Sequence, residues 1–200
     1  MRRDGPISPL GGAIDSSAPE YLQHTNIERV TKLEAAHIVP FMLSKYSTMR
    51  NLLSMFAGSN LNSRLVGRSI NGPSNIFCTD PFTHTLFDEF IIGVEYVNQQ
   101  YKLRKVVTRK AGGPFIARAQ DGEELLFGRG PEGATMDLPD GELFNIHLSI
   151  AKVLHASGAG EVIEKVLQDE DDYREGIVKD EGSCSKILAF ALRQALNGLK

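Results

Sequence analysis

The sequence has no tryptophan, only two cysteines and only five histidines in 200 residues. Cys78 and Cys184 lie too far apart for a metal-ligand pair, so we expect two free thiols in a reducing, intracellular compartment, either nucleus or cytoplasm. No apolar run approaches the roughly 20 residues that a membrane helix needs. No apolar segment follows the basic N-terminus, so we also expect no secretory signal.

Charge is nearly balanced overall but unevenly distributed along the chain. Residues 1–120 contain 14 Lys and Arg against 9 Asp and Glu, whereas residues 121–200 contain 8 against 16. The basic half predicts a face that binds a polyanion. Two interpretations of the acidic half stay open: its helices only keep the protein soluble, or they bind a protein partner or cover the basic face.

The residue pattern predicts an α+β fold in three segments. Residues 1–25 are rich in Gly, Pro and Ser, and we expect a flexible N-terminal segment there. Residues 26–128 form the expected core, which opens with a short strand near 30–33 that leads into 35–37. Apolar residues spaced three and four apart predict an amphipathic helix over 41–56.

The second half of the core predicts a helix and then a small antiparallel sheet. Thr79 or Asp80 is the expected N-cap of the helix, with Pro81 at its first position. Two strand patterns, 90–97 and 101–107, flank residues 98–100 and predict a hairpin. Further strands are expected at 114–119 and 124–127. Helices at 143–155, 161–167 and 183–196 make residues 129–200 an acidic helical region that we expect to pack on the core.

Four residues carry the chemistry that the sequence suggests. On a helix, His84 and Asp88 are one turn apart and share a face, and imidazole and carboxylate groups are common ligands of divalent metals. The alternative is a surface histidine beside a solvated aspartate. A neutral imidazole at His37 can accept a proton from water. Asn75 can orient that imidazole or tie down the loop that presents it.

Three motifs together resemble the HNH endonuclease family, also called ββα-metal. They are LEAAHIVPF at 33–41, INGPSN at 70–75 and HTLFD at 84–88, and they most resemble the version found in fungal HNH-domain proteins. The resemblance extends over about 33–196. It implies a ββα-metal core of two strands and a helix around one divalent ion, with an inserted helix, a following hairpin or small antiparallel sheet, and C-terminal helices.

The resemblance also implies roles for these residues. His37 is then the general base, Asn75 the middle residue of the motif, and His84 and Asp88 the ligands of a divalent ion, Mg²⁺ or Mn²⁺ with Zn²⁺ as an alternative. Many relatives carry a ligand immediately before the base, where this chain has Ala36. Glu34, on the same strand face as Ala36, is a candidate replacement ligand.

The implied activity is metal-dependent hydrolysis of phosphodiester bonds in DNA, with RNA as an alternative substrate. Basic side chains would bind phosphates without reading sequence. The candidates are Lys45, Arg50, Arg64, Arg68, Lys102, Arg104 and Lys105. A second hypothesis is an HNH-derived interaction module that has weak or no catalysis and binds a protein or nucleic-acid partner. Ala36 and the pI of about 6.0 motivate it.

Overall fold

The structure is a computed structural model of the chain. It describes residues 2–18, 29–40, 47–58, 61, 64–65, 67, 69–107 and 120–156. The chain divides into two compact units, of which the first contains Met1–Ile38 and Asn71–Leu148. The second contains Val39–Ile70 and Ser149–Lys200. This division separates residues 39–70 from the rest of the core that the sequence predicted at 26–128.

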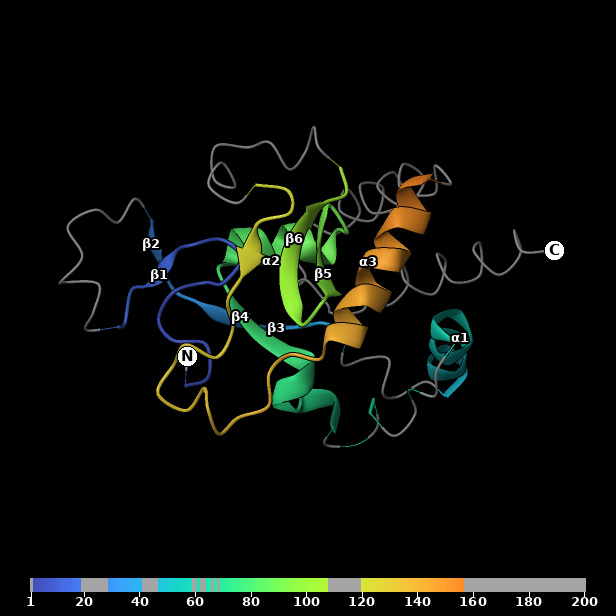
Figure 1. The fold of residues 1–200 in the computed structure, drawn as a ribbon, viewed down its shortest axis with the longest axis horizontal. Helices are drawn as coiled ribbons and strands as arrows, with labels where there is room; N and C mark the ends of the chain where they lie inside the picture. The colour runs from blue at the N-terminus through green and yellow to red at the C-terminus, as the bar shows by residue number, and fades with distance from the viewer. Residues whose placement is uncertain are drawn as a thin grey trace, which may run out of the picture. The chain divides into compact units, whose positions relative to one another are not determined.

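The described elements make a mixed fold of short strands and few helices, as the sequence predicted (Figure 1). In chain order they are β1 (Ile14–Asp15), β2 (Val30–Thr31), β3 (Glu34–His37), α1 (Ser47–Ala57), η3 (Ser69–Asn71), η4 (Pro73–Asn75), β4 (Ile76–Thr79), α2 (Pro81–Asp88), β5 (Ile92–Val97), β6 (Gln100–Lys105), β7 (Glu124–Leu125) and α3 (Gly141–Ala156). None of the helices in the described ranges has the length and apolar character that a membrane crossing requires.

The strands form three small sheets. Strands β1 and β2 pair in parallel, β3 and β4 pair antiparallel, and β5, β6 and β7 form an antiparallel sheet. In the β3–β4 pair, Glu34 lies opposite Thr79 and His37 lies opposite Ile76. The sequence between these two strands contains α1, the inserted helix that the sequence predicted.

Helix α2 begins where the sequence predicted, because its capping residues act locally. Asp80 is the N-cap and accepts hydrogen bonds from the backbone N–H of Thr83 at 3.1 Å and from its hydroxyl at 2.7 Å. Pro81 takes the first helical position, where its missing N–H loses no bond. The fully buried Asp80 also accepts a bond from Ser8 at 3.2 Å and pairs with Arg29 at 3.0 Å. These contacts fix the start of α2 in space.

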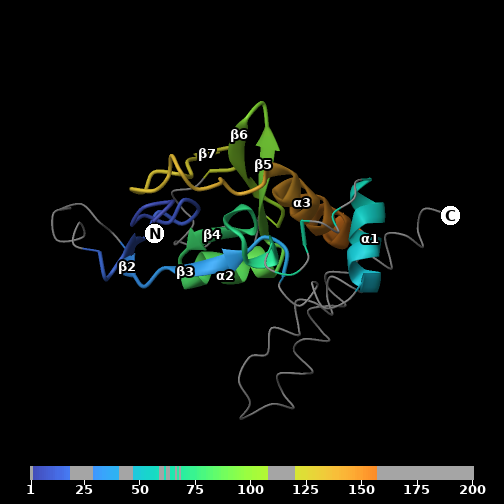
Figure 2. The ribbon, with the colours of Figure 1, turned by 90° about the horizontal axis from the view of Figure 1, so that it is seen from below.

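An aromatic cluster holds α2 against β4, and Figure 2 shows α2 beside the β3–β4 pair. Phe77 of β4 meets Phe87 of α2 edge-on, with ring centroids 5.1 Å apart. Phe144 of α3 lies 5.5 Å from Phe77 and 6.1 Å from Phe87. All three rings are fully buried, and each contributes about 1.5–3 kcal/mol through removal of apolar surface from water.

His147 belongs to this core rather than to the surface. Its ring stacks on Phe87 at a centroid distance of 3.7 Å and lies 4.8 Å from Phe90. Burial lowers the pKa of His147 from 6.5 to about 3, so the ring is neutral at physiological pH. Its Nδ1 has no hydrogen-bond partner among the described residues.

The hairpin of β5 and β6 confirms the sequence prediction with a tighter turn. Val97 pairs with Gln100, so only Asn98 and Gln99 form the loop. Both have positive φ, 51° and 63°, which is the requirement of a type I′ turn. Strand β7 is shorter than predicted and α3 matches the helix predicted at 143–155. The strand predicted at 114–119 and the helices at 161–167 and 183–196 lie outside the described residues.

Candidate functional site

His84 lies between two carboxylates that come from different elements. Its Nδ1 is 2.6 Å from Glu34 Oε1 on β3, and its Nε2 is 3.4 Å from Asp88 Oδ2 one turn further along α2. The side chains of Glu34 and Asp88 are 44% and 45% exposed, so solvent reaches both. The His84 and Asp88 pair expected from the sequence is therefore present, and Glu34 joins it.

The pKa of Asp88 depends on its burial and on the charged groups around it. Burial is the main cause that raises the pKa of Asp88, although part of the side chain stays exposed. His84 opposes the rise, the negative charges of Glu34 and Glu89 add to it, and His37 opposes it. His37 thus lies within electrostatic range of Asp88. Ionisation of Asp88 therefore costs more than that of a free aspartate, and a cation beside it would offset that cost.

His37 ends β3 and has a defined partner on one ring nitrogen. Its Nε2 lies 2.9 Å from the side-chain oxygen of Asn71. An amide oxygen can only accept, so Nε2 carries the proton in this contact. In the neutral ring Nδ1 then has the free lone pair. This arrangement suits a general base, because the hydrogen bond from Nε2 to Asn71 leaves Nδ1 as the nitrogen that accepts a proton.

Asn75 holds the end of β3, next to His37, through its backbone. It is 1% exposed, and its carbonyl accepts a hydrogen bond from the N–H of Ile38 at 2.9 Å, directly after His37. Its own N–H donates to Gly72 at 3.0 Å. The sequence singled out Asn75 and missed Asn71. Both lie in the same turn-rich motif, and spacing alone cannot tell which side chain reaches the histidine.

The face of β3 that carries Glu34 also explains the position of Ala36. Alternation along a strand puts Glu34 and Ala36 on one face and Ala35 and His37 on the other. Ala36 is fully buried, and its methyl side chain has no atom that could coordinate an ion. Glu34 stands two residues earlier on that face, at the exposed end of the strand. It is the acidic residue of β3 that reaches α2.

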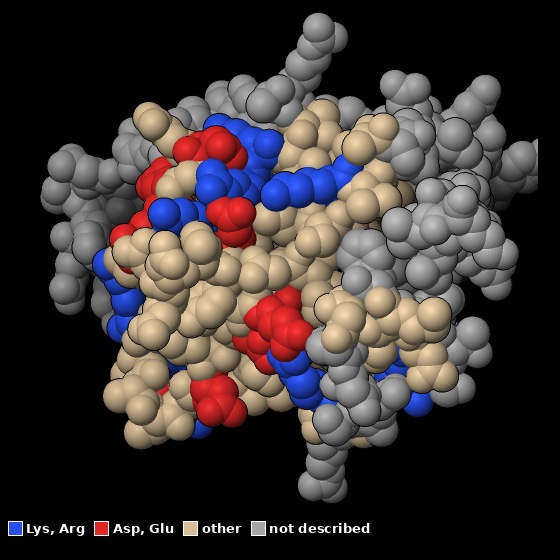
Figure 3. Space-filling model, turned by 45° about the vertical axis from the view of Figure 1, so that its right-hand side comes forward, with Lys and Arg blue, Asp and Glu red and all other residues tan. Residues whose placement is uncertain are grey.

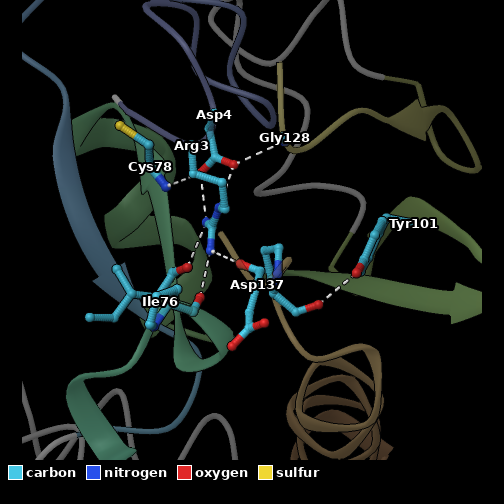
Figure 4. A network of polar contacts seen from close by, with 9 residues as sticks. Arg3, Asp4, Ile76, Cys78, Tyr101, Gly128 and Asp137 are labelled. Carbon is cyan, nitrogen blue, oxygen red and sulfur yellow. Dashed lines mark hydrogen bonds and ion pairs between the residues drawn. The ribbon is translucent and has the colours of Figure 1, made fainter. Parts of the chain in front are cut away.

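A buried ion pair near the N-terminus, which the sequence did not predict, holds the loop before β4. Arg3 pairs with Asp4 at 2.6 Å, and both side chains are at most 6% exposed. The guanidinium also donates to the carbonyls of Pro73 at 2.5 Å, Ile76 at 2.7 Å and Asp137 at 3.3 Å (Figure 4). We call this pair the Arg3–Asp4 clasp. Two of its carbonyl partners, Pro73 and Ile76, flank Asn75.

Asp4 completes the clasp by accepting from two backbone N–H groups. Those of Cys78 in β4 and Gly128 in the later loop each lie 3.2 Å away (Figure 4). The N-terminal residues 2–18 also bury Leu10 and Ala13. The sequence predicted a flexible segment at 1–25, without these contacts. The signal that could have suggested them is an adjacent Arg-Asp pair before a glycine, which is ambiguous because such pairs are usually solvated.

The basic residues expected to bind phosphate lie in different environments. Arg104 pairs with Glu95 of the neighbouring strand β5 at 2.5 Å and with Asp121, in the turn before β7, at 3.4 Å. Lys102 and Lys105 stand on the same strand, β6, and are partly exposed. Arg50 and Arg64 belong to the second unit, and Lys45 and Arg68 lie outside the described residues. Figure 3 shows Lys and Arg side chains beside Asp and Glu on the described part of the face drawn there.

The donor atoms near His84 could hold a divalent ion of only certain kinds. Within the described ranges, no group of three or more His, Cys, Asp or Glu side chains is arranged to hold a metal. His84 and Asp88 offer one imidazole nitrogen and one carboxylate. This set fits Mg²⁺ or Mn²⁺, which keep several waters and need only one or two carboxylates. It fits a closed zinc site poorly, because such a site takes four protein ligands.

Comparison with known proteins adds one finding to this geometry. Residues 17–95 match the family described as HNH endonuclease. The match includes β3, α2, His37, Asn71, Asn75, His84 and Asp88, and the family description suggests a nuclease that acts on a nucleic acid. No curated protein and no solved structure matches the chain.

Proposed function

We propose that this protein is a metal-dependent HNH-type endonuclease that hydrolyses phosphodiester bonds of DNA, with RNA as an alternative substrate. The observation that carries the proposal lies inside the HNH match at 17–95. There, an imidazole on α2 has carboxylates at both ring nitrogens, and a second imidazole, that of His37, acts electrostatically on the same Asp88 carboxyl. A base and a candidate metal site are the two parts that phosphodiester hydrolysis requires.

In the proposed reaction, His37 is the general base. Its Nδ1 accepts a proton from a water molecule while Nε2–H stays bonded to Asn71. The water oxygen forms a bond to phosphorus as the bond to the leaving oxygen breaks, and the leaving oxygen takes a proton from solvent. His84 and Asp88 would hold the ion, which when bound neutralises phosphate charge and stabilises the leaving oxygen. Asn71 is a positioning residue for His37.

Lys102 and Lys105 are the described candidates from the basic set whose charge is free to approach a phosphate, since no ion pair engages either one in the described structure. Contacts of this kind bind the backbone of any sequence. We therefore expect cleavage with little sequence preference and a marked decrease in binding as salt rises.

The test is nicking of supercoiled plasmid with Mg²⁺ or Mn²⁺ by the wild type and by His37→Ala. Loss of a general base lowers the rate by about 10²–10⁴-fold. Asn71→Ala should give an intermediate rate, because the imidazole remains but is no longer held. His155→Ala is a matched control for loss of a histidine outside the site, and it should cleave at the wild-type rate. Structured RNA replaces the plasmid in a parallel series.

The competing hypothesis, an interaction module without catalysis, makes the opposite prediction. Its supporting observation is that no group of three metal ligands exists among the described residues. If the wild type nicks neither DNA nor RNA with any divalent ion, and calorimetry detects no ion uptake, the endonuclease proposal is wrong.

A further inference from the structure

The two nitrogens of His84 face carboxylates at very different distances. Nδ1 is 2.6 Å from Glu34, whereas Nε2 is 3.4 Å from Asp88. The first distance is that of a strong, charge-assisted hydrogen bond. The second is too long for one. Glu34 and Asp88 therefore relate to the same ring in two different ways.

These distances indicate which carboxylate can share an ion with the ring. An ion about 2.0–2.2 Å from both a nitrogen and an oxygen keeps those two atoms about 3.0–3.4 Å apart at the usual coordination angles. The gap between Nε2 and Asp88 has this width. The gap between Nδ1 and Glu34 is too narrow to contain an ion.

The hydrogen bond also determines which nitrogen is free. A carboxylate only accepts, so Nδ1 of His84 is the donor to Glu34. In the neutral ring the lone pair then lies on Nε2, the nitrogen that faces Asp88. Histidine ligands in proteins commonly donate their other N–H to a carboxylate in this way, which fixes both tautomer and ring orientation.

We propose that Glu34 is a positioning residue rather than a metal ligand: it holds His84 in the tautomer that offers Nε2 to an ion shared with Asp88. This inference rests on the proposed metal-dependent function. Glu34, at the exposed end of β3, would then orient a side chain of α2. The protein ligands of the ion would be one imidazole and one carboxylate. The remaining coordination positions are then left for water and phosphate.

The experiment compares Glu34→Gln with Glu34→Ala in the full chain. Glutamine keeps an oxygen that can accept from Nδ1–H, whereas alanine removes it. Glu89→Gln is the matched control, because Glu89 also acts on Asp88 and the change removes one negative charge. Long-range ¹H–¹⁵N NMR of the ion-free protein at pH 8 reports the His84 tautomer. Calorimetry with Mn²⁺ alone reports affinity.

We expect the wild type, Glu34→Gln and Glu89→Gln to show the Nδ1–H tautomer and Mn²⁺ affinities within about threefold of one another. Glu34→Ala should lose the tautomer preference and bind Mn²⁺ about 10–100-fold more weakly. If Glu34→Gln loses as much affinity as Asp88→Ala, Glu34 is a ligand and the inference is overturned. An unchanged tautomer in Glu34→Ala overturns it too, while the metal-dependent function stands. If the wild type binds no Mn²⁺, the proposed function fails as well.

Discussion

Replacement of Arg3 by methionine should be among the most destabilising single changes in the described part of the chain. Methionine keeps much of the volume and removes the charge. Asp4, 3% exposed, then becomes a buried carboxylate without its cation, and the carbonyls of Pro73, Ile76 and Asp137 lose their donor. Removing one partner of a buried ion pair costs about 3–5 kcal/mol. That is a large part of the about 5–15 kcal/mol that stabilises a typical domain.

The measurement is urea unfolding followed by far-ultraviolet circular dichroism. With a slope of about 2 kcal/mol per M, the loss shifts the midpoint by about 2 M. Arg2→Met is the matched control, because Arg2 is 80% exposed and its pair with Glu132 is long, at 3.4 Å. Exposed pairs of this kind contribute at most about 1 kcal/mol. Amide exchange at Cys78, whose N–H donates to Asp4, reports the clasp locally.

A double-mutant cycle separates loss of the pair from loss of packing. Asp4→Asn in the Arg3→Met background removes the stranded charge, so the double variant should be more stable than the sum of the two single losses predicts by about 1–3 kcal/mol. A loss below about 1 kcal/mol for Arg3→Met, or additive losses in the cycle, would refute the assignment of the clasp as a buried, mutually dependent pair.

Two further changes test the core and the start of α2. Because burial lowers the pKa of His147 to about 3 from 6.5, its neutral form stabilises the fold fully above about pH 6.5 and loses that contribution as pH falls toward 3. Between pH 6 and 4 the free energy of unfolding should therefore fall by about 1.4 kcal/mol more per pH unit in the wild type than in His147→Phe. Equal pH dependence of the free energy of unfolding in the two proteins, measured by urea titration, would contradict this. A Cβ at Gly11 would lie 1.9 Å from Asp80 Oδ2 and 2.5 Å from the Thr83 hydroxyl. Gly11→Ala should thus cost about 1–3 kcal/mol in thermal unfolding, and an unchanged melting temperature would show that the cap of α2 tolerates displacement.

The parts of the fold that the sequence could predict depend on neighbouring residues. Asp80 and Pro81 begin α2 through bonds that reach only three residues along the chain. Alternation on either side of Asn98 and Gln99 predicts the hairpin for the same reason, although not the tightness of the turn. The i,i+4 spacing of His84 and Asp88 likewise put both on one helical face, and the structure keeps them 3.4 Å apart at their polar atoms.

The parts that could not be predicted depend on residues far apart in the sequence. Glu34 reaches His84 across 50 positions, and Arg3 reaches Asp137 across 134. No local pattern distinguishes a charged side chain with such a partner from one that is solvated. The choice between Asn71 and Asn75 is of the same kind, since their motif does not determine which side chain faces His37 and which acts through its backbone.

The antiparallel pairing of β3 and β4 has one more consequence, for the segment inserted between them. The first unit breaks off after Ile38 and resumes at Asn71. At that break the N–H of Ile38 bonds to the carbonyl of Asn75, and His37 bonds to Asn71. The chain therefore leaves and re-enters the first unit at neighbouring points. A short linker could join those two points without altering the register of β3 and β4. His37, the imidazole proposed to activate water, thus stands one residue before the end of this part of the first unit.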